Sequence, residues 1–212
     1  SEMCIRDSTR TVPIDRVRVI GERINPTGKK RLKQAILEQD FDYILSQGLS
    51  QLEAGAQILD VNMGMPEVDE SRMLPLVIQK LQGVLDAPLQ IDSSNVKAIE
   101  QALRLYNGKP IVNSVNGEEG SMNAILPLVK KYGAAVVALT LDDKGIPLLA
   151  EERFAIAERI VAHAEQYGIP REDIYVDCLT LTASVQQKEV VETLKAMRMV
   201  KEQLGCRTLL GV

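Results

Sequence analysis

Three stretches decide the fold: QILDVN at residues 57–62, LQIDSS at residues 89–94 and IVNSVN at residues 111–116. Each is a short apolar run, rich in Ile and Val, that turns to Asp, Asn or Ser towards its end. Strands that are apolar throughout, instead of alternating with polar residues, are typical of a parallel sheet buried on both faces by helices. These stretches therefore predict parallel strands with polar carboxyl ends.

The same unit recurs along the whole chain. Further strands are predicted at residues 17–25, 135–142, 174–179 and 207–212, and amphipathic stretches predict crossover helices at 40–54, 69–85, 95–106, 121–132, 150–167 and 187–204. Strands that alternate with helices indicate the α/β class. Seven repeated units, without a GxGxxG or GxxxxGK[ST] motif, favour a (β/α)8 TIM barrel over a doubly wound open sheet.

The domain organisation follows from where the periodicity begins and ends. Residues 1–16 show none, so we predict a linker or non-native leader there and one barrel domain over residues 17–212. A complete barrel takes about 250 residues and closes with an eighth strand and a last helix. Because this chain has 212 residues and stops at its seventh strand, we expect a domain that is incomplete at its C-terminus, truncated after strand 7.

Composition excludes several classes of function. The net charge is -4 and aromatic residues make up 3%, which argues against nucleic acid as a partner. No apolar run is long enough to span a membrane and no signal peptide is visible, so we predict a cytoplasmic protein with no membrane partner. The three cysteines lie far apart without a CxxC motif, and we predict no metal site.

Polar residues collect where the predicted strands end, which is where a parallel barrel builds its active site. Carboxylates accept hydrogen bonds and carboxamides both donate and accept, so such a set complements a flat heterocycle with mixed edges, such as a 2-amino-4-oxopyrimidine. The alternative is that these residues cap the helices that follow. The candidates are Glu22, Asn25, Asp60, Asn62, Asp92, Asn113 and Asp177.

At these positions the sequence resembles the pterin-binding domains of corrinoid-dependent methyltransferases. The motifs are VIGERINPTGKK (19–30), ILDVNMG (58–64), LQIDSSN (89–95), KPIVNSVNGEE (109–119) and YVDCL (175–179). Within that family the nearest likeness is to the folate-binding domain of cobalamin-dependent methionine synthase. Dihydropteroate synthase shares the fold, but its first two strand-end motifs differ from ERINPTGKK and DVNMGMPEV here.

The resemblance implies binding of 5-methyltetrahydrofolate and transfer of its N5 methyl group to cob(I)alamin or another corrinoid on a partner domain or protein. It implies that Asp92, Asn113 and Asp177 are catalytic and hold the pterin ring, with Asp60 and Asn62 beside or beneath it. Glu22 and Asn25 would line the same mouth. The alternatives are a free-standing methyltetrahydrofolate:corrinoid/iron-sulfur protein methyltransferase, a dihydropteroate synthase-like enzyme and a non-catalytic pterin-binding module, and a homodimer stays open.

Other features favour structural interpretations. His163 lies within a predicted helix, away from any strand end, and Cys178 is expected to pack because it points away from Asp177 along the strand. The basic run at residues 29–33 opens the first helix and is expected to be a solvated face, although it could also meet a polyglutamate tail or a corrinoid phosphate.

Overall fold

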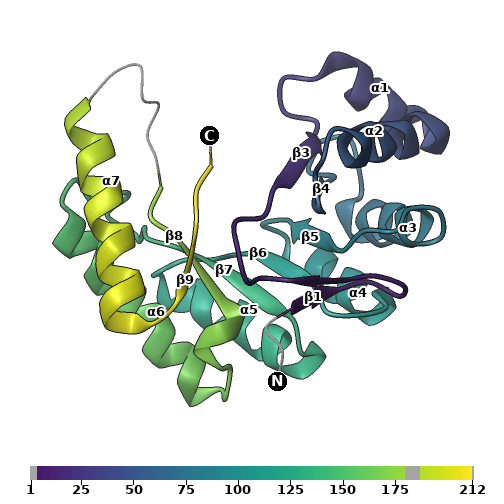
Figure 1. Ribbon diagram of the computed structural model, residues 1–212. Helices are drawn as coiled ribbons and strands as arrows, with labels where there is room; N and C mark the ends of the chain where they lie inside the picture. Colours follow the sequence, from purple (N-terminus) through teal and green to yellow (C-terminus); the bar gives the residue numbers. More distant parts are fainter. Residues whose placement is uncertain (1–3, 180–186, 212) are drawn as a thin grey trace. The chain divides into compact units, whose positions relative to one another are not determined.

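The computed structural model describes residues 4–179 and 187–211 (Figure 1). Its contacts divide the chain into two compact units, Ser1–Asn113 and Ser114–Val212, each of which is described by itself. Both units are built from parallel strands with helices between them, so the α/β class is confirmed. No helix in the described ranges combines the length and apolarity needed to cross a membrane.

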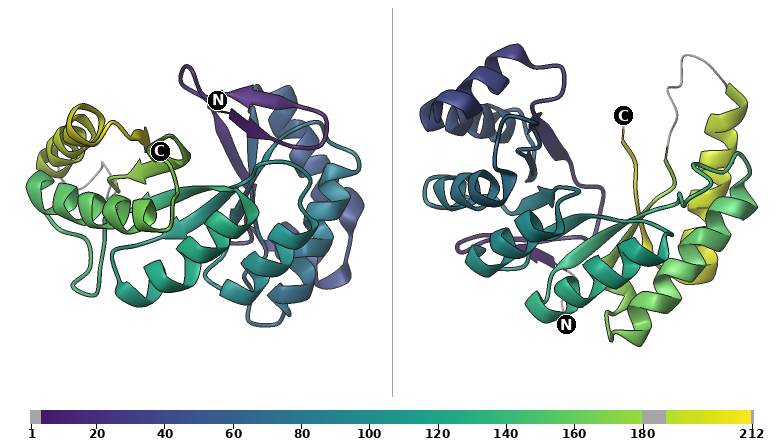
Figure 2. Two further views of the ribbon diagram at one scale, coloured as in Figure 1. Left: turned by 90° about the horizontal axis from the view of Figure 1, so that it is seen from below. Right: turned by 180° about the vertical axis from the view of Figure 1, so that it is seen from behind.

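The first unit contains parallel strands in the order β3 (Ile20–Ile24), β4 (Ile58–Asn62), β5 (Leu89–Asp92) and β6 (Ile111–Val115), of which β6 runs on into the second unit. Helices α2 (Phe41–Glu53), α3 (Glu70–Gln82) and α4 (Val96–Leu105) cover one face of β3 to β5 (Figure 2). Fully buried aliphatic side chains, such as Leu59, Ile91 and Ile78, form the core between strands and helices. This packing fixes the register that positions the strand ends.

The first crossover contains two helices where one was predicted at residues 40–54. Helix α1 (Lys30–Glu38) begins within the basic run and ends at Gln39, whose φ of 55° is left-handed. Asp40 then starts α2, because its side chain accepts a hydrogen bond from the backbone N–H of Tyr43.

The N-terminal residues differ from the predicted linker. Strands β1 (Cys4–Arg6) and β2 (Thr11–Pro13) form an antiparallel hairpin, with Ile5 and Val12 buried. Arg6 exchanges two backbone hydrogen bonds of 2.9 Å with Lys109. Strands of three residues carry too little periodicity to be recognised, and their partner lies about a hundred positions along the chain. The hairpin is therefore folded against the first unit.

The second unit contains β7 (Ala135–Leu139), β8 (Ile174–Asp177) and β9 (Arg207–Leu209) as consecutive parallel neighbours. Helices α5 (Glu119–Tyr132), α6 (Ala150–Gln166) and α7 (Gln187–Met199) accompany them, with a 3-10 turn η1 (Arg171–Asp173) before β8 and a π-helical turn η2 (Val200–Leu204) after α7. All seven predicted strands and all six predicted helices are present in the two units, with bounds shifted by a few residues.

Candidate functional site

The strand ends of the first unit bring polar side chains together through their register. Asp60 of β4 lies opposite Gln90 of β5, and Asn62 lies opposite Asp92. Asp92 in turn lies opposite Asn113 of β6. Since side chains two residues apart on a strand point to the same face, these five residues form one patch at the carboxyl ends of β4, β5 and β6. We call this patch the carboxylate cluster.

Amide groups hold both carboxylates of the cluster in place. Gln90 Nε2 donates to Asp60 Oδ1 at 2.6 Å, and Asn62 Nδ2 donates to Asp92 Oδ2 at 2.9 Å. The other end of the Asn62 amide is also fixed, because its Oδ1 accepts the Gly64 N–H at 2.8 Å. The cluster is therefore pre-organised by neutral groups.

Two acceptor atoms of the cluster have no hydrogen-bond donor among the described residues. Asp60 is 1% exposed and Gln90 is 5% exposed. Asp60 Oδ2 and Gln90 Oε1 are both buried and accept no hydrogen bond from any residue that the structure describes. Buried polar atoms are nearly always paired in native proteins, so two orphaned acceptors in one patch indicate a site that takes a donor from a ligand or from water.

Burial makes both carboxyls of the cluster harder to ionise. Burial, with added repulsion from Asp92 and Glu22, raises the pKa of Asp60 from 3.8 to about 8, although hydrogen bonding to the Gln90 and Asn113 amides partly opposes this. Burial also raises the pKa of Asp92, with Glu22 and Glu70 adding to the effect against the opposing Asn62 hydrogen bond. Without a ligand, the cluster therefore binds a proton more readily than two exposed carboxylates would.

Glu22 and Asn25 lie beside the cluster at the end of β3. The register of β3 shifts between Gly21 and Ile24, so Glu22 and Arg23 together face a single residue of β4. Asn25 Nδ2 donates to Glu22 Oε1 at 3.1 Å, and Asn25 Oδ1 accepts the Thr27 N–H at 3.0 Å. The charge of Glu22 adds to the rise in the pKa values of Asp60 and Asp92.

The structure gives partners to two cations of the basic run. Lys29 Nζ donates to the backbone oxygens of Glu22 and Asn25, at 3.3 and 3.1 Å. Arg31 pairs with Asp40 at 2.7 Å and lies over the Tyr43 ring. These two side chains therefore brace the β3 loop and the α1–α2 junction, a more specific structural role than the solvated face that the sequence predicted.

The second unit places Asp177 at the carboxyl end of β8. Asp177 is half-buried, and its Oδ1 accepts the Leu179 N–H at 2.8 Å. Burial raises the pKa of its carboxyl, and the Leu179 hydrogen bond partly opposes this. The neighbouring Cys178 is buried, and burial raises the pKa of its thiol to about 12, which suits the predicted packing role. The predicted contact of Asp177 with a pterin ring stays a prediction.

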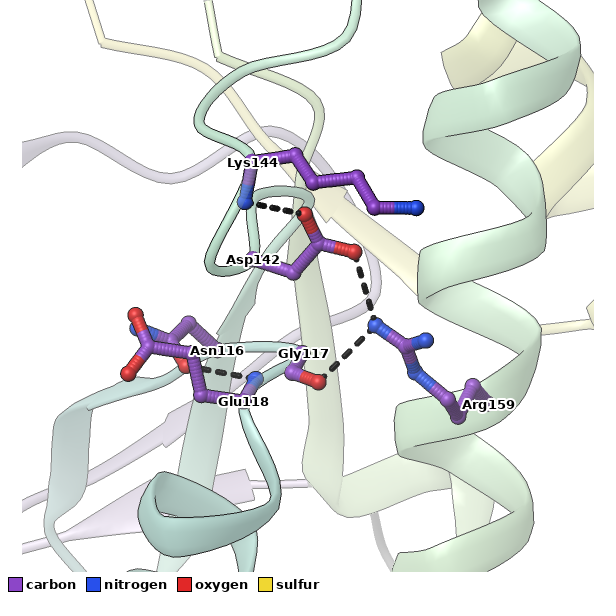
Figure 3. A network of polar contacts seen from close by, with 6 residues as sticks. All are labelled: Asn116, Gly117, Glu118, Asp142, Lys144 and Arg159. Atoms are coloured by element: carbon purple, nitrogen blue, oxygen red, sulfur yellow. Dashed lines mark hydrogen bonds and ion pairs between the residues drawn. The ribbon is translucent and has the colours of Figure 1, made fainter.

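A separate polar network lies after β6 and β7 in the second unit (Figure 3). Arg159 of α6 donates to the Gly117 carbonyl at 2.8 Å and to Asp142 at 3.0 Å. A Cβ on Gly117 would lie 2.7 Å from Ile156 Cγ2 and 3.0 Å from the Leu141 carbonyl oxygen, so glycine is the residue that fits here. Beside the network is an open surface cavity of about 570 Å³, lined by Gly117, Glu118, Glu119, Met122, Asp143, Arg159 and His163. With its arginine already paired and three carboxylates around it, this cavity suits a phosphate poorly.

Sequence reasoning missed Gln90 and Arg153. Gln90 could have been found, because it stands two residues before Asp92 and therefore on the same face of β5. Arg153 is 0% exposed within α6, and no local pattern distinguishes it from Arg159, the exposed arginine of the same helix. Among the described residues, no group of three or more His, Cys, Asp and Glu side chains is arranged to hold a metal ion.

Comparison with known proteins decides the family. The family model described as "Pterin binding enzyme" matches residues 21–212. The chain belongs to this pterin-binding enzyme family. Among curated relatives, it is 30% identical over 207 residues to methionine synthase of Mycobacterium leprae (strain TN), which covers 92% of this chain and 17% of the relative. It is also 30% identical over 197 residues to methionine synthase of Mycobacterium tuberculosis (strain ATCC 25618 / H37Rv), covering 88% and 16%.

The pterin-binding chain thus spans about a sixth of the length of these curated relatives. Solved structures of dihydropteroate synthases share its fold. The enzyme from Xanthomonas albilineans in complex with 7,8-dihydropteroate has a TM-score of 0.72 at 22% identity, covering 99% of this chain and 76% of the other. The enzyme from Stenotrophomonas maltophilia has a TM-score of 0.72 at 20% identity, covering 96% and 74%. At these identities the likeness shows the fold alone.

Proposed function

We propose that this pterin-binding chain binds 5-methyltetrahydrofolate and transfers its N5 methyl group to cob(I)alamin carried by a partner domain or protein, as part of a methionine synthase. The similarity to two mycobacterial methionine synthases over most of this chain supports this choice within the family. The nearest alternative for the same chemistry is a free-standing methyltetrahydrofolate:corrinoid/iron-sulfur protein methyltransferase.

The observation that carries the proposal is the pair Asp60 and Asp92. Each accepts a hydrogen bond from a side-chain amide, and the buried Asp60 Oδ2 has no hydrogen-bond donor among the described residues. Within the described residues, the hydrogen bonds to Asp60 and Asp92 come from the Gln90 and Asn62 amides and not from a lysine or arginine. An anionic ligand would therefore find no cationic partner on these two carboxyls. A 2-amino-4-oxopyrimidine instead presents ring N–H and amino donors, which Asp60 Oδ2 and Asp92 can accept.

Methyl transfer from folate requires help at N5. The N5–CH₃ bond breaks as the methyl group passes to the electron pair of cob(I)alamin, and N5 keeps the bonding electrons. Protonation of N5, or a strong hydrogen bond to it, lets N5 leave as a neutral amine instead of an amide anion. In the proposal, Asp92, Asn113 and Asp177 orient the pterin and stabilise that proton.

A single-turnover reaction tests the proposal. The chain is mixed with 5-methyltetrahydrofolate and cob(I)alamin, and the absorbance of cob(I)alamin is followed by stopped flow. We expect methylcobalamin and tetrahydrofolate to form in equal amounts. The control variant Asp69→Asn should react like the wild type, because Asp69 is a helix cap at the start of α3.

Other products would contradict the proposal. Tight binding of folate without methyl transfer would assign a non-catalytic pterin-binding module. Formation of 7,8-dihydropteroate from 4-aminobenzoic acid and an activated pterin would assign a dihydropteroate synthase-like enzyme.

A further inference from the structure

A buried arginine reaches the turn that follows β8. Arg153 of α6 is 0% exposed, and its Nη1 donates to the carbonyl oxygens of Cys178 and Leu179, each at 3.0 Å. Its Nε donates to the Pro147 carbonyl at 2.8 Å, which ties the same guanidinium to the loop after β7. One side chain therefore binds two consecutive carbonyls after β8 and a third from the neighbouring loop.

Thr193 of α7 adds to these contacts, and we call Arg153 and Thr193 together the clamp. The Thr193 hydroxyl accepts from Arg153 Nη1 at 2.7 Å, and its single proton lies within reach of the Glu189 carbonyl oxygen at 3.0 Å and the Leu179 carbonyl oxygen at 3.2 Å. Thr193 is 2% exposed, and helices α6 and α7 lie side by side (Figure 1). The clamp is thus built from two packed helices and is closed to water.

The clamped turn has a backbone conformation that needs outside support. Leu179 has a φ of 55°, which is rare for a residue with a bulky side chain. In this conformation the Leu179 N–H points back to Asp177 Oδ1 at 2.8 Å. Among the described residues, the Leu179 N–H is the one hydrogen-bond donor to the Asp177 side chain, and it uses Oδ1.

We propose that Arg153 is a positioning residue for Asp177: by holding the carbonyls of Cys178 and Leu179, it keeps the turn that aims the Asp177 carboxylate at the pterin. This inference rests on the proposed function, because it takes Asp177 as a folate ligand. None of the hydrogen bonds of Arg153 within the described residues goes to a carboxylate, and burying a guanidinium in this way is costly. The role of Arg153 is therefore better explained by the backbone geometry that it imposes than by a gain in stability.

A double-mutant cycle on the full chain tests this inference, with dissociation constants for 5-methyltetrahydrofolate measured by calorimetry. Arg153→Lys keeps the charge but cannot reach the three carbonyls together. We expect it to weaken binding by about tenfold in the wild-type background and by less than about twofold in the Asp177→Ala background, because coupled residues are not additive. An equal loss in both backgrounds would show a merely structural role and overturn the inference.

Two further variants keep the test decisive. Arg171→Lys is the control, since Arg171 lies in η1 at the amino end of β8 and donates to the Leu204 carbonyl, and it should leave binding unchanged. If Arg153→Lys does not fold, Thr193→Val takes its place in the cycle, and Thr193→Ser should restore wild-type affinity. No binding by the wild-type chain would overturn the proposed function as well, whereas binding that Asp177→Ala leaves unchanged would overturn this inference alone.

Discussion

The buried carboxyl of Asp60 should make the stability of the chain fall as pH rises. In the folded protein, burial and the neighbouring Asp92 raise the pKa of Asp60 from 3.8 to about 8. Below pH ~4 the carboxyl is protonated in both the folded and the unfolded state. Between pH ~4 and ~8 the unfolded carboxyl is ionised while the folded one keeps its proton, so each increase in pH favours unfolding.

The size of this effect follows from the width of the pH window. Each pH unit within it costs about 1.4 kcal/mol, so going from pH ~5 to pH ~8 should remove on the order of 4 kcal/mol of unfolding free energy. This is a large part of the roughly 5–15 kcal/mol that stabilises a typical domain. Asp60→Asn keeps the shape and the acceptor for Gln90 Nε2 but cannot ionise, so it should abolish this loss.

Urea denaturation followed by circular dichroism at several pH values measures the difference. Relative to the wild type, Asp60→Asn should gain stability steadily from pH ~5 to pH ~8. Asp69→Asn is the control: the hydrogen bond from Ser71 lowers the pKa of Asp69, so this carboxyl is ionised in both states across that range. Parallel curves for the wild type and Asp60→Asn would refute the argument that Asp60 is buried and protonated.

Three other changes have defined outcomes. Asn113→Ala should lower the stopped-flow rate of methyl transfer more than it weakens folate binding, if the cluster stabilises a proton on N5; equal losses would make Asn113 a binding residue only. Asp177→Asn should have the same signature, and an unchanged rate would remove Asp177 from the site. Tyr106→Phe should cost about 1–3 kcal/mol in urea denaturation, because the Tyr106 hydroxyl accepts the Leu89 N–H and donates to the Arg6 carbonyl, joining the hairpin to the first unit.

Most of the fold could be predicted because buried parallel strands are apolar along their whole length. Residues 57–62 and 89–94 show this pattern, and the structure places β4 and β5 within them. The N-terminal hairpin could not be predicted, since its strands have three residues each and depend on Lys109, far along the chain. Helix α1 was missed as an element separate from α2, because it has nine residues and its end depends on the left-handed conformation of Gln39, a residue with no marked preference for it.

The candidate site could be predicted in part, because its polar residues stand where apolar strands end. Asp60, Asn62 and Asp92 end apolar runs, and register alone brings them beside Asn113. The amide partner Gln90 was hidden inside a run that reads as apolar, although its spacing from Asp92 reveals its face. Arg153 could not be found, because its role depends on helix α6 packing against the turn after β8, which no local pattern encodes.

The central claim is that the carboxylate cluster binds the pterin of 5-methyltetrahydrofolate, and calorimetric titration of the chain and of Asp92→Ala tests it most directly. A charge-assisted hydrogen bond contributes roughly 1.5–3 kcal/mol, so we predict that Asp92→Ala weakens folate binding by about 10- to 150-fold. The Asp69→Asn control should bind like the wild type. An unchanged dissociation constant for Asp92→Ala would contradict the account and leave Asp92 as a structural residue at the end of β5.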